Sequence, residues 1–302
     1  MSTTSTGPAP DPAPAPAGRG RGYSPEQRTE ALVEALPYIQ QFRGSIVVVK
    51  LGGNAMADGQ GARTFAQDIV MLRSVGLKPV VVHGGGPQID ELLARLGKQS
   101  TFHNGLRVTD AETLDVVRMV LVGKVGRDIV GQINVHGAYA VGLSGEDGGL
   151  ITAEIRQPEL GYVGEIVAVN PGIIQRLLAE DLIPVVSSIG STTAGQALNI
   201  NADTVAAEVA SALKAEKLIL VTDVEGILRG DKSLISRATP EEIAQLIKDG
   251  VIKGGMIPKA QAAVEALKDG VQSVHIISGK KPSTLLAEVF TEEGSGTMIH
   301  RG

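Results

Sequence analysis

The chain of 302 residues contains no cysteine and no tryptophan, and only 3% of its residues are aromatic. Without cysteine it cannot form disulfides, use a thiolate nucleophile or bind zinc through sulfur, and nothing points to secretion. So few aromatic side chains leave little material for stacking nucleic-acid bases. The core must therefore be built mainly from Val, Ile, Leu, Ala and Gly.

Long apolar runs and one-signed charge patches are also missing. The longest apolar runs are no longer than a strand, so we expect no transmembrane helix. The net charge is −5 and both signs are mixed along the chain, which provides neither a basic stripe for nucleic acid nor a polybasic membrane anchor. No P-loop, H-R-D or D-F-G signature occurs. We expect a cytoplasmic protein that acts on small molecules, and any nucleotide must bind outside those two kinase designs.

The N-terminal residues differ in composition from the rest of the chain. Residues 1–22 are rich in Ser, Thr, Pro, Ala and Gly, which predicts a disordered tail without the apolar stretch of a secretory signal. Residues 23–43 predict a helix with Ser24 as N-cap and Gln27 completing a capping box. Pro37 predicts a kink or break in that helix.

One face of this N-terminal helix is apolar. The stripe at helical spacing consists of Leu32, Ala35, Leu36 and Ile39. Such a face must be buried, either against its own domain or against another subunit. Both alternatives stay open on the sequence.

Short apolar runs alternate with amphipathic segments from residue 44 onward, which is typical of an αβα sandwich around a mostly parallel open sheet. The expected strands are 45–51, 78–83, 139–144, 182–189, 217–223 and 273–278. The expected helices are 64–75, 87–96, 110–135, 171–180, 202–213, 240–249 and 257–269. In residues 150–170 apolar and polar side chains alternate on both sides of a turn, which predicts an inserted β-hairpin. We expect one domain, 44–302, with lobes 44–195 and 196–302.

Ligands of parallel sheets bind beyond the carboxyl ends of the strands, and glycine is enriched there in this chain. The first strand ends in Lys50, followed by Gly52 and Gly53. A lysine can extend from a strand end into solvent, but a buried ammonium needs an anionic partner. The neighbouring glycines favour a phosphate site.

The second strand runs into the sequence VHGGGPQI, in which Gly84, Gly85 and Gly86 precede a helix. Glycines at this position let backbone N–H groups approach an anion, although a tight structural turn has the same composition. The spacing is not that of a dinucleotide fingerprint, because Ile89 stands where its third glycine would be. His83 could act as a base, but a structural role suits a buried strand end better.

Three later motifs add charged and amide side chains. Arg107 precedes a helix and could clamp a carboxylate, or could be an ordinary surface arginine. Asn201 suits an N-cap, which leaves Asn199 and the acidic Asp203 to be explained. Lys259 lies one turn into a helix, where an ammonium is unfavourable unless an anion binds nearby.

These motifs together resemble the amino acid kinase family, and within it the branch that phosphorylates N-acetyl-L-glutamate. The stretches that carry the likeness are KLGGNAM, VVVHGGGPQI, NGLRVTD, LGYVGEI, VSSIG, LNINADTVA, TDVEGIL and GGMIPK, in the order that the family has them. The likeness implies the fold described above and transfer of phosphate from MgATP to the side-chain carboxylate. The product would be N-acetyl-L-glutamyl 5-phosphate, in arginine biosynthesis.

The resemblance also implies roles for individual residues. Lys50 and Lys259 would stabilise the transition state, and Asp203 would organise both. The residues implied for acetylglutamate, in the N-terminal lobe and at its border, are Gly85, Gly86, Arg107 and Asn199. Those implied for ATP are Gly52, Gly53, Asp223, Val224, Glu225, Gly226, Ile227, Leu228, Val251, Ile252 and Lys253, most of them in the C-terminal lobe. No protein metal site is expected, since Mg²⁺ would be held largely by the nucleotide phosphates.

The N-terminal helix and the sequences VHIISGK and LLAEVFTEEGSGTMI resemble the arginine-inhibited members of the family. In those members the N-terminal helices interlace dimers into a hexamer, a trimer of dimers. The likeness implies an arginine site at His275, Glu288 and Gly294. Alternatively, Glu288 and Glu292 are a solvated helix end.

Two other functions remain open on the sequence. One is another acyl or carbamoyl phosphate kinase such as carbamate kinase, whose acceptor has no α-carboxylate for Arg107 to clamp. The other is a non-catalytic arginine sensor, against which the presence of both Lys50 and Lys259 argues.

Overall fold

The computed structural model describes residues 22–53, 59–103 and 105–301. Residues 1–21 of the expected tail lie outside this range, as do residues 54–56 of the KLGGNAM motif and Asn104 of NGLRVTD. The chain divides into two units, residues 1–36 and 37–302. No helix among the described residues is long and apolar enough to cross a membrane.

Helix α1 (Pro25–Phe42) begins as the sequence predicts. The Ser24 amide donates to Gln27 Oε1 over 2.9 Å and the Gln27 amide donates to Ser24 Oγ over 3.3 Å, which confirms the capping box. The helix continues past Pro37, so of the two expected outcomes, a kink or a break, the break is wrong. Proline removes one backbone hydrogen bond, and the turn that follows it ends in the buried side chain of Phe42.

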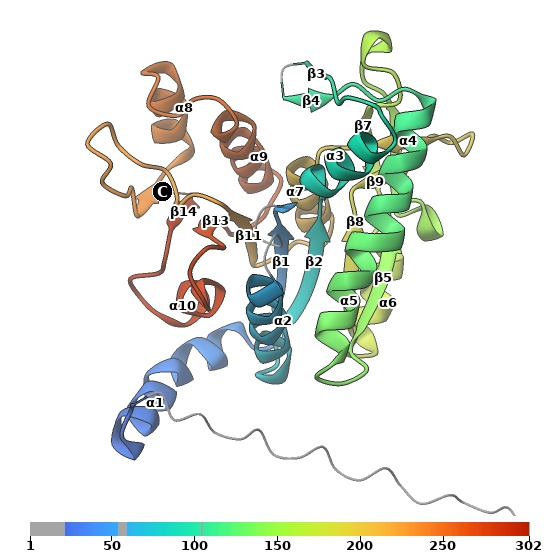
Figure 1. The fold of residues 1–302 in the computed structure, drawn as a ribbon. Coiled ribbons are helices and arrows are strands. Elements are labelled where there is room, and N and C mark those ends of the chain that lie inside the picture. The colour runs from blue at the N-terminus through green and yellow to red at the C-terminus, as the bar shows by residue number, and fades with distance from the viewer. Residues whose placement is uncertain (1–21, 54–58, 104, 302) are drawn as a thin grey trace, which may run out of the picture. The chain divides into compact units, whose positions relative to one another are not determined.

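The described strands of residues 37–302 include an eight-stranded sheet in the order β12-β14-β13-β11-β1-β2-β8-β5 (Figure 1). Only β13 and β14 pair antiparallel in this sheet, so the expected mostly parallel sheet is confirmed. The strands are β1 (Ile46–Leu51), β2 (Lys78–His83), β5 (Ala140–Ser144), β8 (Ile183–Ser187), β11 (Lys217–Thr222), β12 (Arg237–Ala238), β13 (Ser273–Ser278) and β14 (Thr297–His300).

A smaller four-stranded sheet carries the inserted hairpin. Strands β6 (Ile151–Ile155) and β7 (Gly164–Val169) pair antiparallel, as expected. Two short strands, β9 (Ile189–Ser191) and β10 (Ala197–Asn199), complete this sheet, and β3 (Phe102–His103) pairs with β4 (Leu106–Arg107). The predicted strand 182–189 is therefore divided between two sheets. Strands of two or three residues are too short to show a period of two, which is why the sequence did not reveal them.

Helices cover both faces of the large sheet and bury alternate residues of its strands. Val47, Val49 and Val81 belong to one core cluster, and Val48 and Val80 belong to the other. The first cluster is covered by α2 (Gly59–Ser74), α3 (Gly86–Arg95), α4 (Ala111–Arg118), the π-helical segment η2 (Met119–Val125), α5 (Gly126–Asn134) and α10 (Thr284–Phe290). The second is covered by α6 (Gly172–Ala179), α7 (Ala202–Ala212), α8 (Pro240–Lys248) and α9 (Met256–Lys268).

The helical segment 110–135 was expected to be one helix and contains three consecutive elements. Asp110 caps α4 by accepting from the Thr113 amide, and the π-helical turns of η2 lead directly into α5. π-helical turns are rare and are often found at functional sites. Here they lie against the glycines that follow β2, as shown below.

Candidate functional site

Two lysines and one aspartate meet at the carboxyl end of β1. Lys50 Nζ lies 2.9 Å from Asp203 Oδ1, and Lys259 Nζ lies 2.6 Å from Asp203 Oδ2. Asp203 is held in the first turn of α7, because Asn201 caps this helix by accepting from the amides of Asp203 and Thr204. We call Lys50, Asp203 and Lys259 the strand-end cluster.

The charges of the strand-end cluster do not cancel. Burial lowers the pKa of Lys50, against the attraction of Asp203. Burial tends to raise the pKa of Asp203, but the two lysines outweigh it and hold this pKa below its usual value. With both ammonium groups protonated the cluster has one surplus positive charge, and Lys50 is only 7% exposed. A buried surplus charge is costly until an anion binds, so the cluster is suited to a phosphate or a carboxylate.

Glycines lie next to this cluster because the chain is closely packed there. A Cβ at Gly85 would lie 2.8 Å from Leu121 Cδ2 and 3.1 Å from Val125 Cγ2, both in η2. A Cβ at Gly53 would lie 2.7 Å from Pro87 Cδ. No described residue accepts a hydrogen bond from the amide of Gly85. The loop thus offers a backbone donor to a ligand, and its glycines are also required by neighbouring side chains.

Arg107 lies beside the same loop and is buried. Its Nη2 donates to the Gly86 carbonyl over 3.2 Å, and its Nη1 donates to Asp90 Oδ1 over 2.6 Å. Its guanidinium also stacks on the ring of Phe102 at 4.7 Å. Asp90 and Phe102 were not identified as site residues from the sequence, although Asp90 follows the glycine motif by one helical turn. The alternative of an ordinary surface arginine is excluded by its burial.

Asn199 is connected to the Arg107 segment through a threonine. Its Nδ2 donates to Thr109 Oγ1 over 3.1 Å, and Thr109 Oγ1 donates to the Arg107 carbonyl over 2.8 Å. The structure therefore brings Gly86, Arg107 and Asn199 into one connected set.

Most of the residues expected to line a nucleotide lie after β11 and between α8 and α9, and Gly52 and Gly53 follow β1. Ile227 and Ile252 are each 2% exposed and belong to the same core cluster, so they could contact a ligand only through their backbone. Gly226 has a φ of +147°, and a Cβ there would lie 2.6 Å from Thr297 Oγ1. Glu225 is exposed and forms an ion pair of 2.6 Å with Lys281. The other members of the set are Gly52, Gly53, Asp223, Val224, Leu228, Val251 and Lys253.

A second buried charged group lies on the opposite face of the sheet. His275 Nδ1 is 2.6 Å from Glu288 Oε1, and Lys217 Nζ is 3.4 Å from His275 Nε2. These three residues, which we call the α10 cluster, line a cavity of about 540 Å³. Gly294 also lines it, and a Cβ there would lie 2.9 Å from Glu288 Oε2.

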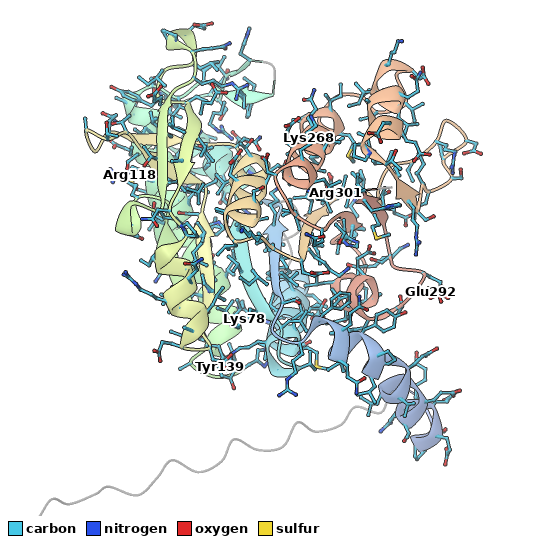
Figure 2. The ribbon with its side chains drawn as sticks, turned by 180° about the vertical axis from the view of Figure 1, so that it is seen from behind. Lys78, Arg118, Tyr139, Lys268, Glu292 and Arg301 are labelled. Carbon is cyan, nitrogen blue, oxygen red and sulfur yellow. The ribbon has the colours of Figure 1, made fainter. Side chains whose placement is uncertain are left out.

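Burial sets the direction of the pKa shift for His275 and Lys217 of the α10 cluster, but not for Glu288. It lowers the pKa of His275 despite the hydrogen bond with Glu288, and it lowers the pKa of Lys217. Burial tends to raise the pKa of Glu288, but the His275 contact and the backbone amide and hydroxyl of Ser295 keep it below its usual value. Glu288 is 7% exposed, so the alternative of a solvated helix end is wrong for it, although Glu292 is exposed (Figure 2).

Lys217 is the member of the α10 cluster that was not identified from the sequence. It begins the apolar strand β11, as Lys50 nearly ends the apolar strand β1. The same signal, a lysine in a run that is otherwise buried, could have identified both residues. Glycines follow Lys50 closely but do not follow Lys217, so the glycine signal predicts a site only at Lys50.

Comparison with known proteins gives the same family as the motifs. The profile of the amino acid kinase family matches residues 45–278. A protein named acetylglutamate kinase from Carboxydothermus hydrogenoformans is 53% identical over 287 residues, which are 90% of this chain and 98% of that protein.

Two solved structures of an N-acetylglutamate synthase from Neisseria gonorrhoeae are also similar. The complex with coenzyme A and N-acetyl-glutamate has a TM-score of 0.82 at 29% identity, covering 91% of this chain and 63% of the synthase. The complex with coenzyme A and L-arginine has a TM-score of 0.78 at 27% identity, covering 91% and 65%. This chain thus spans just under two thirds of the synthase.

Proposed function

Because the chain belongs to the amino acid kinase family, we propose that it transfers a phosphoryl group from ATP to the side-chain carboxylate of N-acetyl-L-glutamate, a step of arginine biosynthesis. The product is N-acetyl-L-glutamyl 5-phosphate. The observation that carries this proposal is the strand-end cluster, a buried surplus of positive charge beside a glycine loop. The name and high identity of the Carboxydothermus relative support the choice of acceptor.

The chemistry of the acceptor matches the residues present. A side-chain carboxylate with a reference pKa of about 4.3 is ionised at neutral pH and needs no general base. Two anions must therefore be brought together, and the transferring group carries negative charge throughout. Lys50 and Lys259 neutralise that charge, while Asp203 keeps both ammonium groups in place. The free amide of Gly85 supplies a further donor.

Arg107 and Asn199 are placed to hold the rest of the acceptor. Asp90 and Ser100 accept from Nη1 of the Arg107 guanidinium and the Gly86 carbonyl accepts from Nη2, which leaves Nε–H and the second hydrogen of Nη2 for the α-carboxylate of acetylglutamate. Asn199 can donate to or accept from the acetamido group after exchanging its contact with Thr109.

ATP supplies the phosphoryl group and Mg²⁺ offsets its charge. Among the described residues there is no group of three or more His, Asp or Glu side chains that could hold a metal ion. We infer that Mg²⁺ is bound mainly by the nucleotide phosphates, and that residues 223–228 and 251–253 bind the nucleotide itself. The excess of lysines over carboxylates in the strand-end cluster fits phosphate oxygens.

The reaction is tested by incubating the protein with MgATP, acetylglutamate and hydroxylamine, which traps an acyl phosphate as a hydroxamate. We expect a hydroxamate with acetylglutamate and little with glutamate. Folded protein that yields none would contradict the proposed function.

The same assay separates the alternatives. For a carbamate-type acceptor, Arg107→Ala would leave the KM of the acceptor unchanged, whereas we expect that KM to rise. For a non-catalytic sensor, wild type and Lys259→Ala would give equal signals.

We also propose that L-arginine inhibits the enzyme by binding at the α10 cluster. Glu288 offers a buried carboxylate to a guanidinium, and the cavity of about 540 Å³ has room for an amino acid. The similar synthase structure that contains L-arginine supports this ligand. A titration of turnover with L-arginine tests it, with D-arginine as the control.

For the oligomer we propose a hexamer, a trimer of dimers formed through α1. Leu32, Val33 and Leu36 of this helix are 66%, 64% and 48% exposed in the single chain. Light scattering should give a hexamer for wild type and a dimer for Leu32→Glu, with Glu30→Gln on the same helix as the control. A dimer for all three proteins would contradict the proposal.

A further inference from the structure

His83, the last residue of β2, is completely buried, and its two ring nitrogens have unequal surroundings. Nδ1 lies 3.1 Å from the carbonyl oxygen of the next residue, Gly84. Nε2 has no hydrogen-bond partner among the described residues. Burial lowers the pKa of His83 to about 4, so the ring is neutral at physiological pH. Because a carbonyl can only accept, the ring hydrogen is on Nδ1 and Nε2 has the lone pair.

This arrangement is unfavourable for stability alone. A buried acceptor without a partner costs about 1–3 kcal/mol. Gly126, the first residue of α5, lies against Nε2, and a Cβ there would be 3.2 Å from that nitrogen. An apolar side chain at position 83 would fill the same core without the orphaned nitrogen. The imidazole must therefore provide something that an apolar side chain cannot.

What it provides is a donor to the Gly84 carbonyl. Among the described residues, only His83 donates a hydrogen bond to the Gly84 carbonyl oxygen. In a planar trans peptide the C=O and the following N–H point in opposite directions. No described peptide bond is cis, so fixing the Gly84 carbonyl toward His83 aims the Gly85 amide away from His83.

The alternation of β2 shows where that amide is aimed. Val81 lies in the core cluster that α5 covers, and Val80 and Val82 lie in the cluster that α7 covers. His83, two residues after Val81, is on the α5 side, where Gly126 meets it. The Gly85 amide is consequently directed to the α7 side, where Asp203 holds the two lysines.

Packing fixes the Cα positions of the loop, but it does not fix the orientation of the peptide group between Gly84 and Gly85. A Cβ at Gly84 would lie 3.2 Å from Ala202 Cβ of α7, and Gly85 is confined by Leu121 and Val125 of η2. These are non-directional contacts with Cα positions. A peptide flip about fixed Cα atoms would reverse the amide without disturbing them, and the His83 hydrogen bond opposes this flip.

We propose that His83 is a positioning residue for phosphoryl transfer: as a neutral imidazole it holds the Gly84 carbonyl and thereby points the Gly85 N–H at the transferring group. It exchanges no proton during the reaction. This inference rests on the role proposed above for the glycine loop.

Three variants test the donor. His83→Asn retains an N–H near the position of Nδ1, whereas His83→Leu and His83→Met have none. We expect kcat to fall about 10- to 100-fold in both apolar variants and to stay within about threefold in His83→Asn, with the KM for ATP little changed in all. We also expect the apolar variants to melt close to wild type, because they remove the unpartnered nitrogen but also remove the donor to the Gly84 carbonyl. Full activity in a folded apolar variant, or an equal loss in His83→Asn, would overturn the proposal.

The pH profile and a loop variant complete the test. Since His83 stays neutral above about pH 5, the kcat profile of wild type and His83→Asn should have the same shape between pH 5.5 and 9. A limb near pH 6–7 that disappears in His83→Asn would make His83 an acid or base and overturn the positioning role. Gly85→Ala separates the proposed role of the glycine loop from the proposed role of His83. Full turnover in the Gly85→Ala variant would refute both roles. A slow Gly85→Ala with a fully active His83→Leu would refute only the role of His83.

Discussion

The two buried charged clusters of this chain are built from similar residues and differ in their balance of charge. The strand-end cluster has two lysines around one carboxylate, and burial is offset by direct ion pairs of 2.9 and 2.6 Å. The α10 cluster has one carboxylate that is already satisfied by His275 and by backbone amides. The first cluster therefore lacks an anion, and the second presents a carboxylate to a cavity.

The two clusters also differ in their places on the sheet. Lys50 pairs in register with Leu220 near the carboxyl end of β11, whereas Lys217 is the first residue of that strand and pairs with Val47. Lys50 faces α7, and His275 faces α10, which lies across the sheet. One sheet thus separates the site proposed for anionic reactants from the site proposed for a cationic effector, and the two sites use opposite faces of it.

The largest effect is expected from a substitution that breaks the strand-end cluster. Lys259→Ala should lower kcat about a thousandfold, because a preorganised charge in a dry site contributes several kcal/mol to the transition state. Lys268→Ala, on the exposed end of the same helix (Figure 2), should leave the rate of hydroxamate formation unchanged. A similar rate in both variants would show that the surplus charge of this cluster has no catalytic role.

The next effect concerns acceptor binding beside that cluster. Arg107→Ala should raise the KM for acetylglutamate about 100-fold, since the α-carboxylate loses a charge-assisted clamp. Asp90→Asn should raise it less, about three- to tenfold, because the guanidinium stays but is less firmly oriented. Steady-state kinetics with ATP saturating checks both values. If Asp90→Asn had the larger effect, Asp90 itself would have to bind substrate.

The α10 cluster should respond in the opposite way. Glu288→Gln should raise the concentration of L-arginine for half-inhibition about 10- to 100-fold and leave uninhibited turnover intact, because the charge of the carboxylate is lost but its shape remains. Glu292→Gln, at the exposed rim of the cavity, is the matched control and should change inhibition little. A loss of basal activity in Glu288→Gln would mean that the two clusters are not separate sites.

The smallest effect concerns the stability that depends on Asp68, a buried carboxyl group next to the start of α10. Asp68 of α2 is 4% exposed and hydrogen-bonds Ser283, the residue before α10, and burial raises its pKa to about 7 despite this bond. The folded protein then keeps a proton that the unfolded chain releases near pH 4, so its stability falls as the pH rises from about 4 to 7.

Asp68→Asn should remove that loss. We expect it to melt about 1–2 °C above wild type at pH 8, the shift that ~1 kcal/mol gives in a protein of this size, with a smaller difference at pH 5. Differential scanning calorimetry at the two pH values checks this. An equal difference at both values would mean that Asp68 does not titrate in this range.

Much of the fold and part of the site could be predicted from the sequence. The strands predicted at 78–83 and 273–278 have the same bounds in the structure. The predicted capping box of Ser24 and Gln27 and the predicted N-cap Asn201 are also confirmed, because these features depend on residues that are close in the sequence. The strands β9, β10 and β14 and helix α10 were missed, since they are short and gain their stability from partners distant in the sequence. For the same reason Asp90 and Lys217 were overlooked: each has significance only through a residue that another element supplies.

By itself the sequence determined which residue types stand at the strand ends, namely a lysine near the end of β1 with glycines after that strand, and three glycines after β2. Local hydrophobic period and turn chemistry suffice for that, because they act over a few residues. Only the tertiary structure decided that Lys50 and Lys259 share Asp203 while Lys217 joins His275 and Glu288 across the sheet. It also decided that the Gly84 carbonyl turns toward His83. Charge pairing within 3–4 Å depends on which faces of distant elements meet, and the packing of the whole sheet fixes those faces.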